Sequence, residues 1–160
     1  MTEIDAAKQR TVSAMEMFLR NFSHVPDDKL HWQAAPGAKS PLRIAAHTAL
    51  YAARFAAMLE TRALPFPDDL DAWLAQRDQE ERQVSTREEV EAAFRAGTER
   101  VLAALDALSP EDLEGTLDSG QGWQMPMRFL VDLAAMHANL HCGQIDFLQT
   151  CWGDQEVYVG

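Results

Sequence analysis

The residues best suited to chemistry are two histidines four positions apart, His137 and His141, in the run His-Ala-Asn-Leu-His-Cys-Gly-Gln at 137–144. The surrounding segment, roughly 126–150, has the apolar spacing of one long helix. Four helical residues turn about 400°, so the two imidazoles project about 40° apart and about 6 Å along the axis. This spacing suits two ligands of one divalent metal ion.

A third histidine, His47, lies on an apolar stripe of the same kind, in the helix predicted for residues 41–61. A single inward-facing histidine is more often a core residue with satisfied hydrogen bonds than a metal ligand. Three such histidines in one chain favour a shared metal site. The other two, His24 and His31, fall in a loop with prolines and a glycine, where we expect them at the surface.

The histidine pair by itself is a weak signal, because five histidines in 160 residues give about 0.15 such pairs by chance. The metalloprotease motif needs glutamate at its second position as general base, and this chain has Ala138 there. Cys142 follows His141, but neighbouring helical residues point about 100° apart, so we expect Cys142 to be neither ligand nor nucleophile. The sequence also lacks a serine triad, a phosphate-binding loop and a dinucleotide fingerprint.

Four long amphipathic segments predict an all-α fold, in which residues 1–160 form a single four-helix-bundle domain. The first spans about 3–22, the second 41–61, the third about 20 residues from 87, and the fourth 126–150. Start signals are Thr2, Ser40 before Pro41, and a capping box at Thr86. A short extra helix is predicted at 69–74, in the second-to-third connection. We expect antiparallel packing, with this second connection long enough to cross over.

Composition excludes several classes of function. The chain has 14 basic and 25 acidic residues, a net charge of −11, without a basic cluster, so nucleic acid is not an expected partner. The N-terminus lacks a secretory signal, and the uncharged stretch 44–53 is shorter than the ~20 residues that span a bilayer. Cys142 and Cys151 would lie ~13.5 Å apart on one helix, too far for a disulfide. We therefore expect a cytoplasmic protein without a membrane partner.

Two blocks of the sequence resemble the DinB/YfiT-like superfamily. Residues 137–145 match its common pattern HxxxHxGQI, followed by a glycine after the helix, here Gly153. Residues 32–41 contain tryptophan, proline-glycine and serine before the second helix, and His47 follows as the helix-two histidine. The departure is Cys142, which stands where a basic residue is frequent and so removes one possible anion contact.

The resemblance implies that His47, His137 and His141 bind one divalent ion, usually nickel or zinc in this family. It also implies a DinB-like four-helix bundle, a homodimer and a small-molecule substrate. Some members are S-transferases or isomerases that use a low-molecular-weight thiol such as bacillithiol, mycothiol or glutathione. Three nitrogen ligands that leave coordination positions open are typical of a catalytic metal site.

Two functions of different class remain open. The first is a metal-dependent enzyme that activates a thiol or water against a small electrophile, as an S-transferase or a hydrolase. The second is a non-catalytic bundle, metal-binding or purely structural, that acts through dimerisation or partner binding.

Three further residues are candidates around the site. Tyr51, one turn beyond His47, either donates a hydrogen bond to a substrate or a nearby water, or is a core aromatic residue. Gln144 either contacts the substrate or orients a ligand. Trp123 either rims the substrate pocket or closes the end of the bundle.

Overall fold

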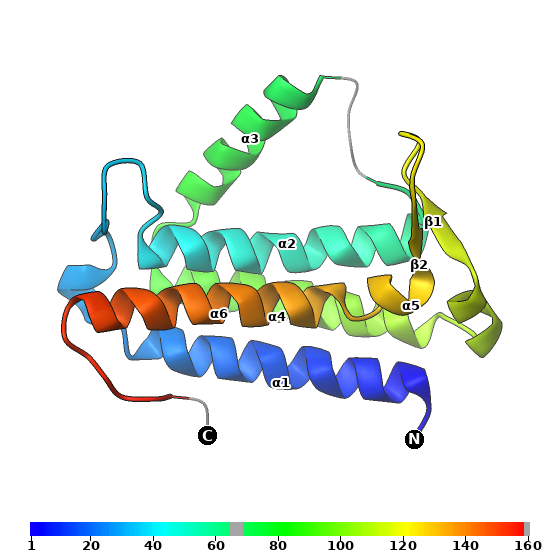
Figure 1. Ribbon diagram of the computed structural model, residues 1–160, viewed down its shortest axis with the longest axis horizontal. Helices are drawn as coiled ribbons and strands as arrows, with labels where there is room; N and C mark the ends of the chain where they lie inside the picture. The colour runs from blue at the N-terminus through cyan, green and yellow to red at the C-terminus, as the bar shows by residue number, and fades with distance from the viewer. Residues whose placement is uncertain (65–68, 159–160) are drawn as a thin grey trace.

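The computed structural model describes residues 1–64 and 69–158. Helices account for most of the described chain (Figure 1). The α-helices are α1 (Glu3–Ser23), α2 (Pro41–Thr61), α3 (Leu70–Gln83), α4 (Arg87–Asp106), α5 (Met127–Leu130) and α6 (Leu133–Cys151). Two 3-10 helices (Asp27–Lys29 and Pro110–Glu114) and a hairpin of β1 (Thr116–Asp118) with β2 (Gln124–Pro126) complete it.

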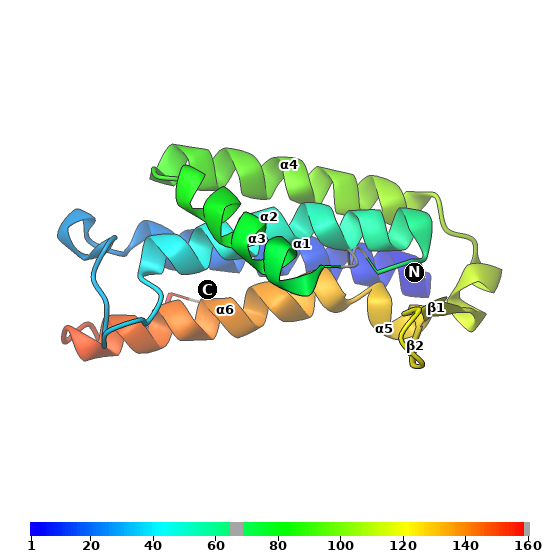
Figure 2. The ribbon, with the colours of Figure 1, turned by 90° about the horizontal axis from the view of Figure 1, so that it is seen from above.

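Helices α1, α4, α2 and α6 follow one another around a four-helix bundle, each packed against two neighbours. The all-α, four-helix-bundle prediction is therefore confirmed. The directions differ from those expected: α1 and α6 run parallel, and so do α2 and α4 (Figures 1 and 2). Helix α3 explains the second pair, because it returns the chain along α2 before α4 begins (Figure 1).

The second connection is long enough to reverse the chain along the bundle, as expected, because α3 carries the chain back along α2 (Figure 1). The first connection, residues 24–40, and the link from α4 to α6 join helices at opposite corners of the bundle. These two links were not predicted, because connection length does not reveal which helices become neighbours.

The helix starts lie where capping chemistry predicted them. Ser40 Oγ accepts a hydrogen bond from the Arg43 amide at 3.4 Å, with Pro41 as the first helical residue. At the start of α4, Thr86 Oγ1 accepts from the Glu89 amide at 3.2 Å, and the Glu89 carboxylate accepts from the Thr86 amide at 3.1 Å. These caps determine where α2 and α4 begin and therefore which of their residues face the core.

Three other local predictions need correction. Helix α3 extends to Gln83 rather than 74. The predicted last helix is split, because Asp132 donates its amide to the Phe129 carbonyl in a tighter turn while its carboxylate pairs with Arg10 of α1 at 2.7 Å. Between the third and fourth predicted helices, where the all-α prediction had no strand, the chain forms the β1–β2 hairpin, which the buried Leu117 of β1 anchors to the core.

Helices α2 and α4 approach closely at Gly97. A β-carbon at that position would lie 2.8 Å from the Ala52 β-carbon and 3.1 Å from the Ala53 amide nitrogen. Only glycine fits this contact, which explains a residue that costs about 1 kcal/mol of helix propensity relative to alanine. The contact sets the depth of α2, the helix that carries His47. Among the described helices, none has both the length and the apolar composition needed to cross a bilayer.

Candidate metal centre

The three predicted histidines meet between α2 and α6. His47 points from α2, and His137 and His141 point from successive turns of α6. The Nε2 atom of His137 lies 3.3 Å from His47 Nε2 and 3.1 Å from His141 Nε2. One nitrogen from each ring falls in a group whose atoms are all within 4.8 Å of one another, so the group can hold a metal ion.

The other ring nitrogen of two of these histidines is already engaged. His47 Nδ1 lies 2.7 Å from Oε1 of Glu81, and His141 Nδ1 lies 2.7 Å from Oε1 of Gln144. Both partners are oxygen acceptors, so each Nδ1 carries the proton and each Nε2 keeps its lone pair. The lone pairs of His47 and His141 therefore face His137 Nε2. Metal-binding histidines are typically oriented in this way by a carboxylate or carbonyl acceptor.

Two of the three distances between these nitrogens fit a shared cation. Nitrogens about 2.0–2.1 Å from one zinc ion lie about 2.8–3.0 Å apart at octahedral angles and about 3.3–3.4 Å apart at tetrahedral angles. The two short separations at His137, 3.1 and 3.3 Å, fall within the range that these two geometries span. Hydrogen bonds alone satisfy the cluster poorly, because a single proton on His137 Nε2 must serve the lone pairs of both His47 Nε2 and His141 Nε2. A cation placed between the three rings interacts with the lone pairs of all three Nε2 atoms.

Glu81 of α3 is the buried anchor of His47. Its side chain is only 2% exposed, and its Oε2 accepts from Lys39 Nζ at 3.0 Å and from Arg43 Nη2 at 3.1 Å. Burial by itself raises the pKa of this carboxyl, but the hydrogen bonds from His47 and Lys39 outweigh burial and bring the pKa to about 2. Glu81 is therefore a carboxylate at neutral pH and holds the proton of His47 on Nδ1.

The electrostatics keep the α6 histidines neutral. Burial, helped by the charges of His141 and His47, lowers the pKa of His137 to about 3. Burial also lowers the pKa of His141, although the hydrogen bond that His141 donates to Gln144 opposes this shift. Neutral imidazole is the form that binds metal, so both are available as ligands across the physiological range.

Aromatic rings wall the histidines on one side. The ring of Tyr51 stacks on that of His137, with centroids 5.0 Å apart and planes at 22°, and lies 4.3 Å from the His47 ring. Phe55 meets the His137 ring edge-on at 5.1 Å. Burial raises the pKa of Tyr51 even though Arg77 and Arg54 oppose the shift. Its hydroxyl therefore remains a hydrogen-bond donor at neutral pH.

Two hollows flank the histidines. One, of about 680 Å³, lies between residues 34–44 and α6, and its wall includes His141, Gln144 and Lys39. The other, of about 310 Å³, lies between α2, α3 and the hairpin, and its wall includes Tyr51 and Trp123. The structure thus places the Gln144 side chain at hydrogen-bond distance from His141 Nδ1 and Trp123 at the rim of a hollow beyond Tyr51.

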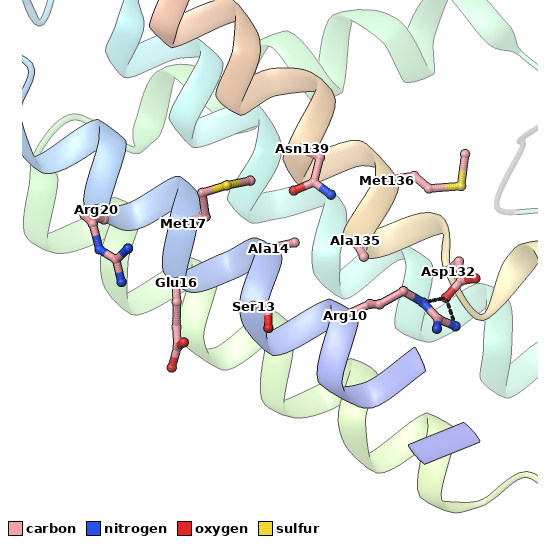
Figure 3. A pocket seen from close by; sticks show the side chains of 10 residues that line it. All are labelled: Arg10, Ser13, Ala14, Glu16, Met17, Arg20, Asp132, Ala135, Met136 and Asn139. Carbon is pink, nitrogen blue, oxygen red and sulfur yellow. Dashed lines mark hydrogen bonds and ion pairs between the residues drawn. The ribbon is translucent and has the colours of Figure 1, made fainter. Parts of the chain in front are cut away.

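A third hollow, of about 460 Å³, lies between α1 and α6 and is shown in Figure 3. Its polar groups include Arg10 and Asp132, which pair with each other, and Asn139. None of the three clustered histidines lines it, and neither does Tyr51, whose ring stacks on His137. We therefore place the candidate chemistry at the hollow that His141 lines and at the hollow that Tyr51 lines.

The comparison with known protein families agrees with this arrangement. The family model described as the DinB superfamily matches residues 7–145. This chain belongs to the DinB superfamily. Among curated proteins, none matches the chain.

Two solved structures of DinB-like proteins share the fold. A DinB-like protein from Bacillus subtilis, YjoA, is 18% identical, with a TM-score of 0.67 over 95% of this chain and 94% of its own. YfiT from Bacillus subtilis, described as a probable metal-dependent hydrolase with an unusual four-helix bundle topology, is 17% identical. Its TM-score is 0.71 over 94% of this chain and 87% of its own.

Sequence reasoning missed Glu81 in this member of the superfamily. The run 76–83 is so polar that it indicates a solvent-exposed connector. The available signal was the spacing of Trp73, Arg77 and Glu81, which share one face if α3 continues. Cys142 is buried, with its Sγ 3.4 Å from Asn21 Nδ2 of α1, so it faces the core and not the histidines.

Proposed function

We propose that this protein is a metal-dependent enzyme in which His47, His137 and His141 hold one divalent ion, nickel or zinc. The observation that carries the proposal is the convergence of three Nε2 atoms, two of them on rings whose Nδ1 atoms are fixed by Glu81 and Gln144. Imidazole ligands suit both metals. An ion held by three imidazoles supplies open coordination positions and lowers the pKa of a water or thiol bound there.

The remaining groups of the site orient the imidazoles and offer a hydrogen bond that polarises a substrate. Glu81 and Gln144 hold two imidazoles in the tautomer that leaves Nε2 free. The Tyr51 hydroxyl, protonated at neutral pH, is the donor available to a substrate oxygen beside His137. The reaction we propose is attack by water or by a low-molecular-weight thiol on a small electrophile, which makes the protein a hydrolase or an S-transferase.

The test begins with metal content. Protein purified without chelators is expected to hold about one nickel or zinc ion per chain, and His141→Ala is expected to lose it. His24→Ala is the matched control, because His24 is an exposed histidine that stacks on Tyr158, away from the cluster. Ester hydrolysis and thiol transfer, with bacillithiol, mycothiol and glutathione, are then assayed with and without the metal. The proposal is contradicted if the wild type purified in this way holds no metal and His141→Ala has the same metal content as the wild type.

A second candidate function is a non-catalytic bundle that acts as a homodimer. Helix α6 exposes three large apolar side chains along one face: Met136 at 47%, Leu140 at 64% and Phe147 at 64%. Gly143 lies between Leu140 and Phe147 with open space around it, so a second copy can approach closely about a two-fold axis. This row favours pairing of two copies through α6.

Sedimentation at tens of micromolar tests the dimer. The wild type is expected to sediment as a dimer and Leu140→Glu as a monomer, with Asn139→Glu as the exposed neighbouring control. The non-catalytic function further requires that chelation lowers the melting temperature while no hydrolase or transferase activity appears. Metal-dependent turnover rules it out as the sole function.

A further inference from the structure

The hollow between α2, α3 and the hairpin has the character of a binding site for a small molecule. Its volume, about 310 Å³, lies at the lower end of the range for ligand pockets, roughly 300–1,000 Å³. Tyr51 belongs to its wall and also stacks on His137. Trp73 of α3 and Trp123 of the hairpin add two further aromatic surfaces. A ligand here is separated from the histidines by the thickness of one ring.

Arg77 is the side chain of this hollow that distinguishes it from a purely apolar pocket. Its guanidinium lies over the rings of Tyr51 and Trp73, 4.8 and 4.5 Å from their centroids. Its Nε is buried without a hydrogen-bond partner, and in residues 1–64 and 69–158 no carboxylate lies within ion-pair distance of it. Arg54, on the same wall, is paired with Glu80 at 2.5 Å.

An arginine without a carboxylate partner among the described residues is unexpected at this place. The chain has 25 acidic and 14 basic residues. On the same helix, Arg82 lies at the surface and still pairs with Asp78 at 2.6 Å. Arg77 is half-buried, where its contacts with two aromatic rings offset only part of the hydration that the guanidinium loses. Its environment therefore favours an anionic ligand.

The shape of the guanidinium and the composition of the walls define that ligand. A guanidinium binds a carboxylate through two parallel hydrogen bonds, and aromatic walls favour a planar apolar body. We propose that this hollow binds a small aromatic carboxylate, with the carboxylate on Arg77 and the ring among Tyr51, Trp73 and Trp123. The inference goes beyond the proposed function, because the Tyr51 ring lies between this hollow and His137, so the hollow is a second site beside the metal centre.

Calorimetric titration of the full chain with 2-naphthoate and with its neutral analogue 2-naphthamide tests the inference. The wild type is expected to prefer the carboxylate by about tenfold or more, the strength of a charge-assisted pair. Arg77→Met is expected to lose that preference, and Arg77→Lys to retain part of it. Arg82→Met, an exposed arginine of the same helix, is the control and keeps the wild-type ratio. The ratio is independent of the folded fraction, since both ligands are titrated into one sample.

Equal affinity of the wild type for the two probes, or an unchanged ratio in Arg77→Met, overturns the inference. Each titration is run on metal-loaded and on chelated protein, and metal binding is measured separately. Naphthoate binding without metal binding removes the proposed function and leaves the hollow as an anion site. Metal binding without naphthoate binding removes the inference about the hollow and leaves the proposed function in place.

Discussion

Replacement of Glu81 by glutamine is expected to weaken metal binding about 10- to 100-fold, the usual cost of losing an acceptor behind a ligand histidine. The substitution keeps an oxygen that can accept from His47 Nδ1, so the ring is not released outright. It removes the negative charge that makes the Nε2 atom of His47 a stronger electron-pair donor to a metal ion. It also turns an amide NH₂ toward Lys39 Nζ and Arg43 Nη2, which in the wild type donate hydrogen bonds to Oε2 of Glu81.

The magnitude follows from these contacts. A loss of 10- to 100-fold corresponds to about 1.4–2.7 kcal/mol of binding free energy. The free energy of unfolding is expected to fall as well, though by less than the 3–5 kcal/mol of a broken buried ion pair. The reason is that Arg43 retains Asp78 at 2.6 Å, and the Lys39 side chain is 43% exposed and can be hydrated.

Competition with a chelating dye measures the affinity, and thermal melts of the metal-free proteins measure the stability. Glu80→Gln is the matched control, because Glu80 is the adjacent carboxylate of α3 and pairs with Arg54 rather than with a histidine. Wild-type affinity in Glu81→Gln, or an equal loss in Glu80→Gln, refutes the role assigned to Glu81.

Three further predictions concern stability and metal affinity. Gly97→Ala is expected to destabilise the fold by about 1–3 kcal/mol in urea unfolding, because its β-carbon overlaps Ala52, whereas Gly143→Ala, in open space, should be neutral or stabilising; equal effects refute the contact. Because the pKa of His137 is lowered to about 3, the unfolded chain binds a proton that the folded one does not as pH falls below 6.5. Metal-free stability should therefore decline from pH 6.5 toward pH 3, by at most about 1.4 kcal/mol per pH unit from this group, and His137→Gln should show a shallower slope in urea titrations. Gln144→Ala frees the His141 ring and should lower metal affinity about 10-fold in the dye assay; unchanged affinity would show that the hydrogen bond does not orient the ligand.

The local signals in the sequence were sufficient for the helix starts and for the inward-facing histidines. Capping residues such as Ser40 and Thr86 act on the adjacent backbone, so helix starts can be read without tertiary information. The histidine spacing and the apolar stripes placed all three imidazoles toward the interior. Their convergence is what the bundle adds, because α2 and α6 are neighbours only in the folded chain.

Features that depend on distant contacts could not be predicted. Glu81 is one of 25 acidic residues, and only its position under Lys39 and Arg43 makes it a buried carboxylate. The parallel pairing of α2 with α4 depends on the path of α3, which carries too many charges to indicate a packed helix. The hairpin has only three residues per strand, too few for an alternating pattern.

An anomalous-diffraction map of crystals grown from protein purified without chelators tests the central claim most directly. We predict one peak at the convergence of His47, His137 and His141, about 2.0–2.2 Å from each Nε2. The absorption edge of the crystal should identify the metal as nickel or zinc. A map without a peak at the three imidazoles, or with a peak bound elsewhere, contradicts the account.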